Sequence, residues 1–230
     1  MRRGWSVPAR AGDASKMQTR LPRVRPVQRR PDPLFALPIG PVFTGWLLFY
    51  FLLTCAYSWG LKRLMLVDCL VLAMLYTVRI IAGAGAAGIP LSFWLLAFAV
   101  FLFLSLAFVK RYAELIVQAD AGKEKAHGRG YLISDAPLVQ SLGITSGYAS
   151  VVVLALYLNS DAVVKLYLVP AIMWCAVPVM LFWVSWIWMK AHRGEMHDDP
   201  LVFALRDRVG LIAGVVFFGV LLAGSRGWVW

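Results

Sequence analysis

The sequence predicts an all-α protein, a bundle of about six helices that cross a membrane. Three observations lead to this fold class. The chain of 230 residues is 60% hydrophobic, above the roughly half that is usual for soluble domains. Several of its apolar stretches reach the length of about 18 residues that marks a membrane-spanning helix. Those stretches fill most of the chain after residue 33, so no room is left for a soluble domain.

Composition divides the chain into a tail and a membrane domain. Nine of the 23 Lys and Arg residues fall within the first 30 positions, where prolines also recur. No apolar core of a signal peptide follows the early arginines, so we interpret residues 1–33 as a disordered tail. No nucleic-acid-binding motif accompanies its charge, which leaves either lipid or no partner as the expectation for the tail. We assign residues 34–230 to the membrane domain.

The membrane domain contains six predicted spans, separated by short polar or turn-forming connections. These spans are Pro41–Leu61, Leu66–Ala87, Leu91–Val109, Pro137–Leu158, Leu166–Met189 and Val209–Gly224. A tight uncharged turn at Ile89-Pro90-Leu91 joins the second span to the third. A kink is expected in the fifth span at Pro178, because proline disrupts the hydrogen bonds of a helix.

Basic residues alternate from one connection to the next. The first, third and fifth connections carry two or more Lys or Arg residues each, whereas the second carries none and the fourth carries one. Basic loops face the cytoplasm, so these three connections are placed there. The same rule places the basic tail on the non-cytoplasmic side, although its own basic residues favour the cytoplasm. We interpret this conflict as a sign that the tail is foreign sequence in the place of further helices.

Two charged residues fall inside the second predicted span. Asp68 and Arg79 are eleven positions apart, which places them within about 20° of one helix face and about 16 Å apart along the axis. Charged side chains in a spanning helix are costly and usually face a cavity or a partner. The alternative for Asp68 is that it reaches the membrane surface from the end of the helix.

A polar connection between the third and fourth spans is the most informative segment. It runs from Val109 to Asp135 and holds nine charged side chains. Asp120 and Glu124 are four positions apart, and paired carboxylates suit Mg²⁺, which often also contacts substrate phosphates. Lys and Arg suit the phosphates themselves. The alternative is a solvated connection stabilised by ion pairs such as Lys110 with Glu114.

A third polar segment precedes the last span and contains two histidines and three carboxylates. These residues are His192, Glu195, His197, Asp198 and Asp199. The spacing of the histidines does not match the zinc-binding HExxH helix, so a transition-metal site is not expected. The three cysteines lie in apolar stretches without CxxC spacing and are interpreted as small buried residues.

Four segments together resemble a known family. They read YTVRIIAG, LAFVKRYAEL, GRGYLISD and DDPLVFALRDR. These segments are similar to the UbiA superfamily of membrane prenyltransferases, and most similar to its branch that resembles decaprenyl-phosphate phosphoribosyltransferase. The resemblance covers Pro41 to Gly224. It implies the last six helices of a nine-helix fold in a bacterial inner membrane, with a site for Mg²⁺ and a diphosphate facing the cytoplasm.

The resemblance also implies which residues form that site. Those implied as catalytic are Lys110, Arg111, Glu114 and Tyr131. Those implied to bind substrate phosphates are Lys62, Arg63, Arg79, Lys110, Arg111 and Arg129. Those implied as Mg²⁺ ligands are Asp120, Glu124 and Asp135, and those implied to line the cavity are Asp68 and Tyr76.

The function implied by the resemblance is a Mg²⁺-dependent transfer that involves a polyprenyl phosphate or diphosphate. It is either prenyl transfer or phosphoribosyl transfer to a polyprenyl phosphate. The Asp-rich NDxxDxxxD motif of the family is missing from this sequence, so little activity is expected from this chain alone. The implied partners are the polyprenyl lipid, membrane lipid, and either a haloacid-dehalogenase-like domain upstream or the missing N-terminal helices.

Two other functions stay open on the sequence. One is a non-catalytic membrane module or partner subunit. The other is a small transporter, which is less favoured because no internal repeat with broken helices is found.

Overall fold

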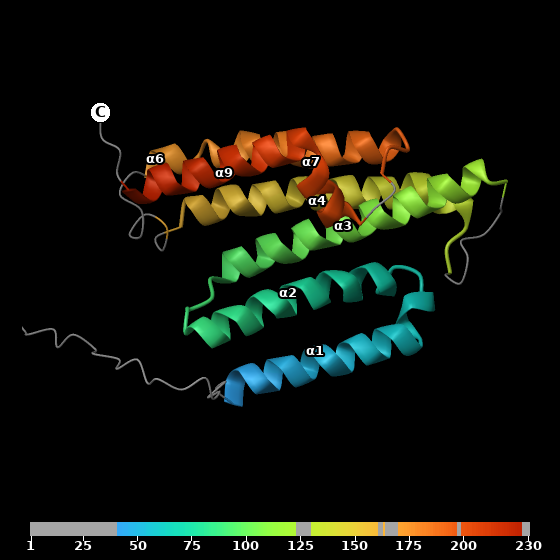
Figure 1. Ribbon diagram of the computed structural model, residues 1–230, viewed down its shortest axis with the longest axis horizontal. Helices are drawn as coiled ribbons and strands as arrows, with labels where there is room; N and C mark the ends of the chain where they lie inside the picture. Colours follow the sequence, from blue (N-terminus) through green and yellow to red (C-terminus); the bar gives the residue numbers. More distant parts are fainter. Residues whose placement is uncertain (1–40, 123–129, 161–162, 164–169, 197–198, 227–230) are drawn as a thin grey trace, which may run out of the picture. The chain divides into compact units, whose positions relative to one another are not determined.

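The computed structural model describes residues 41–122, 130–160, 163, 170–196 and 199–226 (Figure 1). The predicted tail 1–33 lies outside these residues, as do Glu124 and Arg129. Every regular element in the described part of the chain is helical, which confirms the all-α class. The longer helices are α1 (Pro41–Trp59), α2 (Val67–Ala87), α3 (Phe93–Asp120), α4 (Ala136–Leu158), α7 (Ala176–His192) and α9 (Arg208–Arg226). The short ones are η1 (Leu61–Arg63), η2 (Ile133–Asp135), α6 (Pro170–Met173) and α8 (Pro200–Arg206).

Five helical segments of the described residues are long and apolar enough to cross a membrane. They are Val67–Ala87, Phe93–Asp120, Ile133–Leu158, Ala171–His192 and Arg208–Ser225. The first predicted span corresponds to a shorter apolar helix, Phe43–Trp59. The chain is therefore a multi-pass membrane protein, and each of the five later predicted spans overlaps one of these segments.

The turn between α2 and α3 lies where the sequence predicts it. Gly88 ends α2 with a left-handed φ of 65°, and its N–H donates to the carbonyl of Ala84. The N–H of Ile89 donates to the same carbonyl at 3.0 Å. Glycine adopts this conformation without the steric cost that a Cβ imposes, and Pro90 then prevents the helix from continuing.

The predicted end of the third span was wrong. Helix α3 does not end at Val109 but continues to Asp120, and three residues beyond Val109 are buried in its continuation: Arg111, Tyr112 and Leu115. The first charges mark where apolar sequence ends. They do not end the helix, because a helix that leaves the bilayer can still bury one face against its neighbours. The first half of the predicted connection is thus helical.

The predicted kink at Pro178 is a break located slightly earlier. The α-helical assignment is interrupted at Trp174 and Cys175, between α6 and α7, where the N–H groups donate to carbonyls three residues earlier. Pro178 is the third residue of α7, and a proline ring clashes with the carbonyl four residues before it, here that of Trp174. Helix α7 also runs to His192, one turn beyond the predicted end at Met189.

Neighbours in the chain are also neighbours in the bundle. Figure 1 shows α2, α3 and α4 side by side, and α3 packs on both α2 and α4, while α4 also packs on α7. Gly143 and Gly147 of α4 permit the close approach. A Cβ on Gly143 would lie 2.2 Å from the Trp188 ring, and one on Gly147 would lie 2.6 Å from Val184. Small residues in a membrane helix allow side chains of the neighbouring helix to contact its backbone in this way.

Candidate functional site

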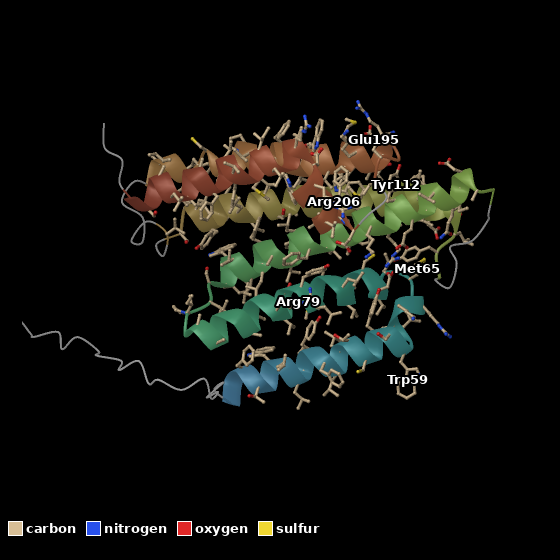
Figure 2. The ribbon with its side chains drawn as sticks, in the orientation of Figure 1. Trp59, Met65, Arg79, Tyr112, Glu195 and Arg206 are labelled. Carbon is tan, nitrogen blue, oxygen red and sulfur yellow. The ribbon has the colours of Figure 1, made fainter. Side chains whose placement is uncertain are left out.

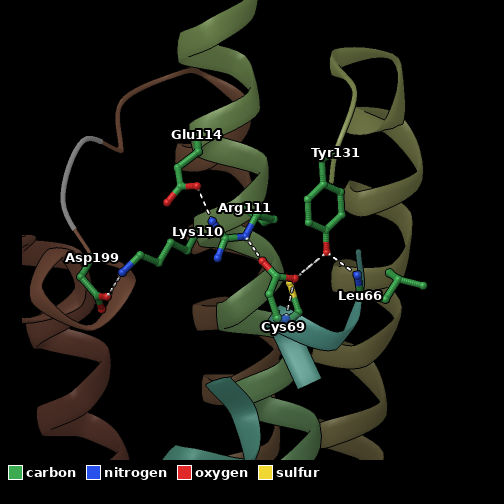
Figure 3. A network of polar contacts seen from close by, with 8 residues as sticks. Leu66, Cys69, Lys110, Arg111, Glu114, Tyr131 and Asp199 are labelled. Carbon is green, nitrogen blue, oxygen red and sulfur yellow. Dashed lines mark hydrogen bonds and ion pairs between the residues drawn. The ribbon is translucent and has the colours of Figure 1, made fainter. Parts of the chain in front are cut away.

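A buried ion pair joins the polar ends of α2 and α3. Nε of Arg111 lies 2.7 Å from Oδ2 of Asp68, and the two side chains are 1% and 0% exposed (Figure 3). This contact is within ion-pair distance but is poorly aligned for a hydrogen bond, so the attraction is mainly between the charges. Arg111 also pairs with Glu114, one turn later on α3. Buried charges of this kind are tolerated only when paired.

Tyr131 completes the surroundings of Asp68. Its hydroxyl donates to Oδ1 of Asp68 at 2.7 Å and accepts from the backbone N–H of Leu66 at 2.8 Å. The N–H of Cys69 donates to the same Oδ1 at 2.7 Å. The Tyr131 side chain is 1% exposed, and burial raises the pKa of its phenol above the ordinary value. The phenol is therefore neutral and holds both partners.

Leu66, at the start of α2, has an unusual backbone conformation. Its φ is 66° and its ψ is −38°, and the N–H of Val67 donates to the carbonyl of Met65 at 2.8 Å, which is the pattern of a γ-turn. A positive φ is costly for a residue with a side chain and persists only where the surroundings enforce it. The hydrogen bond from Leu66 to Tyr131 is one such constraint.

Gly130 allows the Tyr131 segment to approach this turn. A Cβ on Gly130 would lie 2.9 Å from the carbonyl oxygen of Arg63 and 3.4 Å from the N atom of Met65. Only a residue without a side chain fits at that distance. The glycine thus contributes to the position of the Tyr131 hydroxyl over α2.

Lys110 forms the second ion pair of this region. Its Nζ lies 2.7 Å from Oδ2 of Asp199, the residue that precedes α8 (Figure 3). Both side chains are about one third exposed, 36% for Lys110 and 30% for Asp199. The pair therefore contacts solvent, unlike the pair of Arg111 with Asp68.

A polar pocket opens beside this pair. Its volume is about 490 Å³, and its lining includes Lys110, Glu114, Gln118 and Asp199. A much smaller cavity of about 30 Å³ lies on the other side, and Lys110 and Asp199 line it as well, together with Tyr76. Lys110 and Asp199 thus stand between the polar pocket and a small cavity among the apolar side chains of α2 and α3.

The structure brings together some of the residues named from the sequence. Asp68, Arg111, Glu114 and Tyr131 form one connected network around the ends of α2 and α3, and Lys110 lies next to it in its own ion pair with Asp199. Tyr76 lines the small cavity next to Lys110.

Other named residues lie apart from this network. Asp120 is exposed at the far end of α3, and Asp135 accepts the N–H of Leu132 at 2.9 Å, where it supports the start of α4. Lys62 and Arg63 form η1, and neither lines the polar pocket. Arg79 lies eleven residues further along α2 from Asp68, towards the middle of the helix and away from this network.

Two residues of the site were not identified by sequence reasoning. Tyr57 of α1 lies within electrostatic range of Arg111 and Asp68. It follows Tyr50 by two helical turns, so the two tyrosines share a face, and that spacing is the signal that could have found it. Asp199 was named only as part of a polar segment. Its contact with Lys110 spans 89 positions, for which a single sequence offers no signal.

The described residues contain no group of three or more His, Cys, Asp or Glu side chains that could hold a metal ion. Glu114 and Asp199 are two carboxylates that line one pocket. Mg²⁺ is commonly bound by one or two carboxylates together with substrate phosphates. The donor set therefore fits an ion that arrives with a phosphorylated substrate better than a permanently bound one.

Comparison with known proteins finds relatives without an enzymatic name and relatives that are named as enzymes. It is 40% identical over 177 residues to the uncharacterized protein y4nM of Sinorhizobium fredii, which covers 76% of this chain and 33% of that protein. It is 36% identical over 174 residues to the nodulation protein NoeC of Azorhizobium caulinodans, over 73% of this chain and 57% of NoeC. No protein-family model matches the chain.

A third relative has an enzymatic name. The chain is 31% identical over 177 residues to the decaprenyl-phosphate phosphoribosyltransferase of Mycolicibacterium smegmatis, over 75% of this chain and 55% of the enzyme. The chain thus spans between a third and just over half of the length of these relatives. The similarity relates it to a membrane transferase and agrees with the resemblance seen in the sequence.

Proposed function

We propose that the chain is part of a UbiA-type membrane transferase that acts on a polyprenyl phosphate or diphosphate. One observation carries the proposal: the polar pocket of about 490 Å³ at the end of α3 is lined by Lys110, whose ammonium group pairs with Asp199 of the same lining. The pocket lies where a spanning helix leaves its apolar stretch, so a lipid phosphate at the membrane surface can reach it. The similarity to a phosphoribosyltransferase supports this chemistry.

Lys110 is the proposed phosphate-binding group. The ammonium group of a lysine beside an open pocket suits a phosphate, and its charge would stabilise the negative charge that develops on the leaving diphosphate. Arg111 is too deeply buried to approach a ligand in the described arrangement, with 1% of its side chain exposed. We propose that Arg111 keeps Glu114 in place at the wall of the pocket, and that Asp68 and Tyr131 keep Arg111 in place.

Glu114 and Asp199 are the proposed contacts for Mg²⁺ bound to the substrate. When bound, the ion would neutralise part of the diphosphate charge and make the diphosphate a better leaving group. Lys110 already neutralises Asp199 in the described arrangement. A phosphate that draws Lys110 towards itself would leave the carboxylate of Asp199 available.

The proposed reaction breaks the C–O bond between the transferred carbon and the diphosphate. The bonding electrons go to the leaving oxygen, and the same carbon forms a new bond to the acceptor. In phosphoribosyl transfer the acceptor atom is a phosphate oxygen of the polyprenyl lipid. In prenyl transfer the polyprenyl group is donated instead to a carbon of an aromatic ring, and that ring carbon loses its proton to solvent. The named relative favours phosphoribosyl transfer.

The proposal is tested with the chain in lipid vesicles that contain decaprenyl phosphate. Labelled phosphoribosyl pyrophosphate and Mg²⁺ are added, and transfer of label to the lipid fraction is measured. We expect slow transfer that needs Mg²⁺ and that falls at least about tenfold in Lys110→Met, because one charge-assisted contact contributes that much. A parallel assay with a polyprenyl diphosphate and an aromatic acceptor tests prenyl transfer.

Lys190→Met is the matched control. Lys190 also pairs with a carboxylate, that of Glu195, but it does not line the polar pocket. Its replacement is expected to leave transfer unchanged. An equal loss of transfer activity in both variants would refute the role of Lys110 in phosphate binding. Binding of the phosphorylated substrates without any transfer would favour the alternative function, a non-catalytic membrane module.

A further inference from the structure

Arg79 is a charged residue at the middle depth of a membrane-spanning helix. It lies twelve residues after the first residue of α2 and eight before the last, or about 18 Å and about 12 Å along the axis. Figure 2 shows it well away from both ends of the helix. The hydrocarbon layer is about 30 Å thick, so the headgroup phosphates of the bilayer lie beyond the ends of α2.

Two tyrosines hold the guanidinium group of Arg79. Its Nη2 donates to the hydroxyl of Tyr50 on α1, and the group lies 5.1 Å from the centre of the Tyr50 ring and 4.9 Å from that of Tyr76. Tyr76 is itself stacked on Phe103 of α3, with ring centres 5.0 Å apart. The position of Arg79 is thus fixed by α1, α2 and α3 together.

The side chain of Arg79 does not extend towards the nearer membrane surface. An intramembrane arginine side chain normally does so. The nearer end of α2 is at Ala87, whereas Tyr76 lies one turn in the opposite direction. Arg79 is therefore turned away from the nearer surface and kept at depth.

The charge of Arg79 has no counter-ion in the described part of the chain. No carboxylate there lies within ion-pair distance of it, and the side chain is exposed. Asp68 is about 16 Å away along the same helix and pairs with Arg111. Tyr50 accepts from one nitrogen only, so further N–H donors of the five in a guanidinium group are left for an anion.

We propose that the face of α1 and α2 that carries Arg79 binds another membrane helix with an Asp or Glu side chain at the same depth. A carboxylate in the plane of the guanidinium group matches its fork of donors and neutralises the charge at this depth of the membrane. Bilayer headgroups do not reach this depth, which is why a helix-borne carboxylate is favoured over a lipid phosphate. This interaction is independent of the proposed transfer reaction.

The test uses a synthetic apolar helix of about 21 residues with one central Glu and a dansyl group, and an identical peptide with Gln. Energy transfer from the tryptophans of the chain, of which there are ten, to the dansyl group reports association in vesicles. We expect the Glu peptide to bind about tenfold more tightly than the Gln peptide. The preference should disappear in Arg79→Met and persist in part in Arg79→Lys.

Arg193→Met is the control, because Arg193 is an exposed arginine in the connection after α7. It should keep the full preference for the Glu peptide. Arg79→Met replaces a charge by an apolar side chain in lipid, so it is expected to fold, which helicity and thermal unfolding check. Equal binding of the two peptides, or an unchanged preference in Arg79→Met, would overturn the proposal. Displacement of the Glu peptide by decaprenyl phosphate would overturn it too, because it would show that Arg79 binds phosphate.

Discussion

At the scale of single residues, Arg111 links the packing of the bundle to the chemistry of the site. Its guanidinium group is buried between Asp68 on α2 and Glu114 on its own helix. Removing two charges from water costs free energy, and the attraction between the two charges offsets this only while both partners stay together. The pair therefore holds the polar ends of α2 and α3 at a fixed distance. That distance sets where Lys110 stands at the wall of the pocket.

Replacement of Arg111 should destabilise the protein strongly. Arg111→Met leaves the buried Asp68 without its ion partner, for which a loss of about 3–5 kcal/mol is expected. The free energy of unfolding in mixed detergent micelles measures the effect. The exposed Arg193 is again the matched control, and Arg193→Met should change stability by less than about 0.5 kcal/mol. Similar values for the two variants would contradict a structural role of the buried pair.

Loss of the Tyr131 hydroxyl should have a smaller effect. Tyr131→Phe removes one acceptor for the N–H of Leu66 and one donor to Asp68. Buried groups that lose a hydrogen-bond partner cost about 1–3 kcal/mol. Thermal unfolding of the variant in detergent measures this loss. An unchanged melting temperature would show that Tyr131 does not support the turn at Leu66.

The same phenol predicts how stability depends on pH. Its pKa is raised by burial in the folded state, so the folded protein keeps the proton at pH values where the unfolded chain has lost it. Stability from this group is complete below the unfolded pKa of about 10 and falls as the pH rises above it. Unfolding of wild type and Tyr131→Phe across alkaline pH should show the decline more steeply in the wild type. The same decline of stability with pH in both proteins would contradict a contribution from the Tyr131 phenol.

At the scale of helices, apolar length predicted where spans exist but not where they end. The charges after Val109 end the apolar stretch, yet α3 continues to Asp120 because it still packs through Tyr112 and Leu115. In the fifth span the position of Pro178 predicted a disturbance, and the break falls at Trp174 and Cys175, next to the carbonyl that the proline ring excludes. The ends depend on tertiary packing, which hydropathy does not contain.

Close packing of α4 predicts sensitivity at Gly143. In Gly143→Ala the new methyl group would lie 2.2 Å from the buried ring of Trp188 and 2.7 Å from Cβ of Phe108. Overpacking of this kind costs about 1–3 kcal/mol, which unfolding in detergent measures.

Gly83 of α2 is the matched control for this substitution. It is a helical glycine too, with nothing within 4 Å of the added Cβ. Gly83→Ala should be neutral or stabilising by up to about 1 kcal/mol, since alanine favours a helix over glycine. A loss of the same size at both positions would show that the glycines act through the backbone and not through packing.

At the scale of the whole molecule, the sequence did not predict which charged residues contact one another between helices. Asp68 and Arg79 were expected near one face of α2, but the partner of Asp68 lies on α3 and that of Arg79 on α1. The alternative of a solvated connection paired Lys110 with Glu114, whereas in the structure Lys110 pairs with Asp199, 89 positions later. Helical periodicity relates residues within one helix only, so contacts between helices could not be predicted from it.

The orientation of the molecule remains a prediction that can be measured. The basic connections place Lys62 and Lys190 on the cytoplasmic side and Ser92 on the other. Cysteines introduced by Lys62→Cys and Lys190→Cys should react with an impermeant maleimide in inverted vesicles but not in intact cells. Ser92→Cys should show the reverse. The same labelling pattern for all three positions would contradict the assigned topology.

The most direct test of the proposed site is the binding of pyrophosphate to the purified chain. Equilibrium dialysis with labelled pyrophosphate and Mg²⁺ measures the affinity of wild type, Lys110→Met and Lys190→Met. Binding should weaken at least about tenfold in Lys110→Met and stay unchanged in Lys190→Met, because Lys110 alone of the two lines the polar pocket. Wild-type affinity in Lys110→Met, or no Mg²⁺-dependent binding by the wild type, would contradict a phosphate site in this pocket.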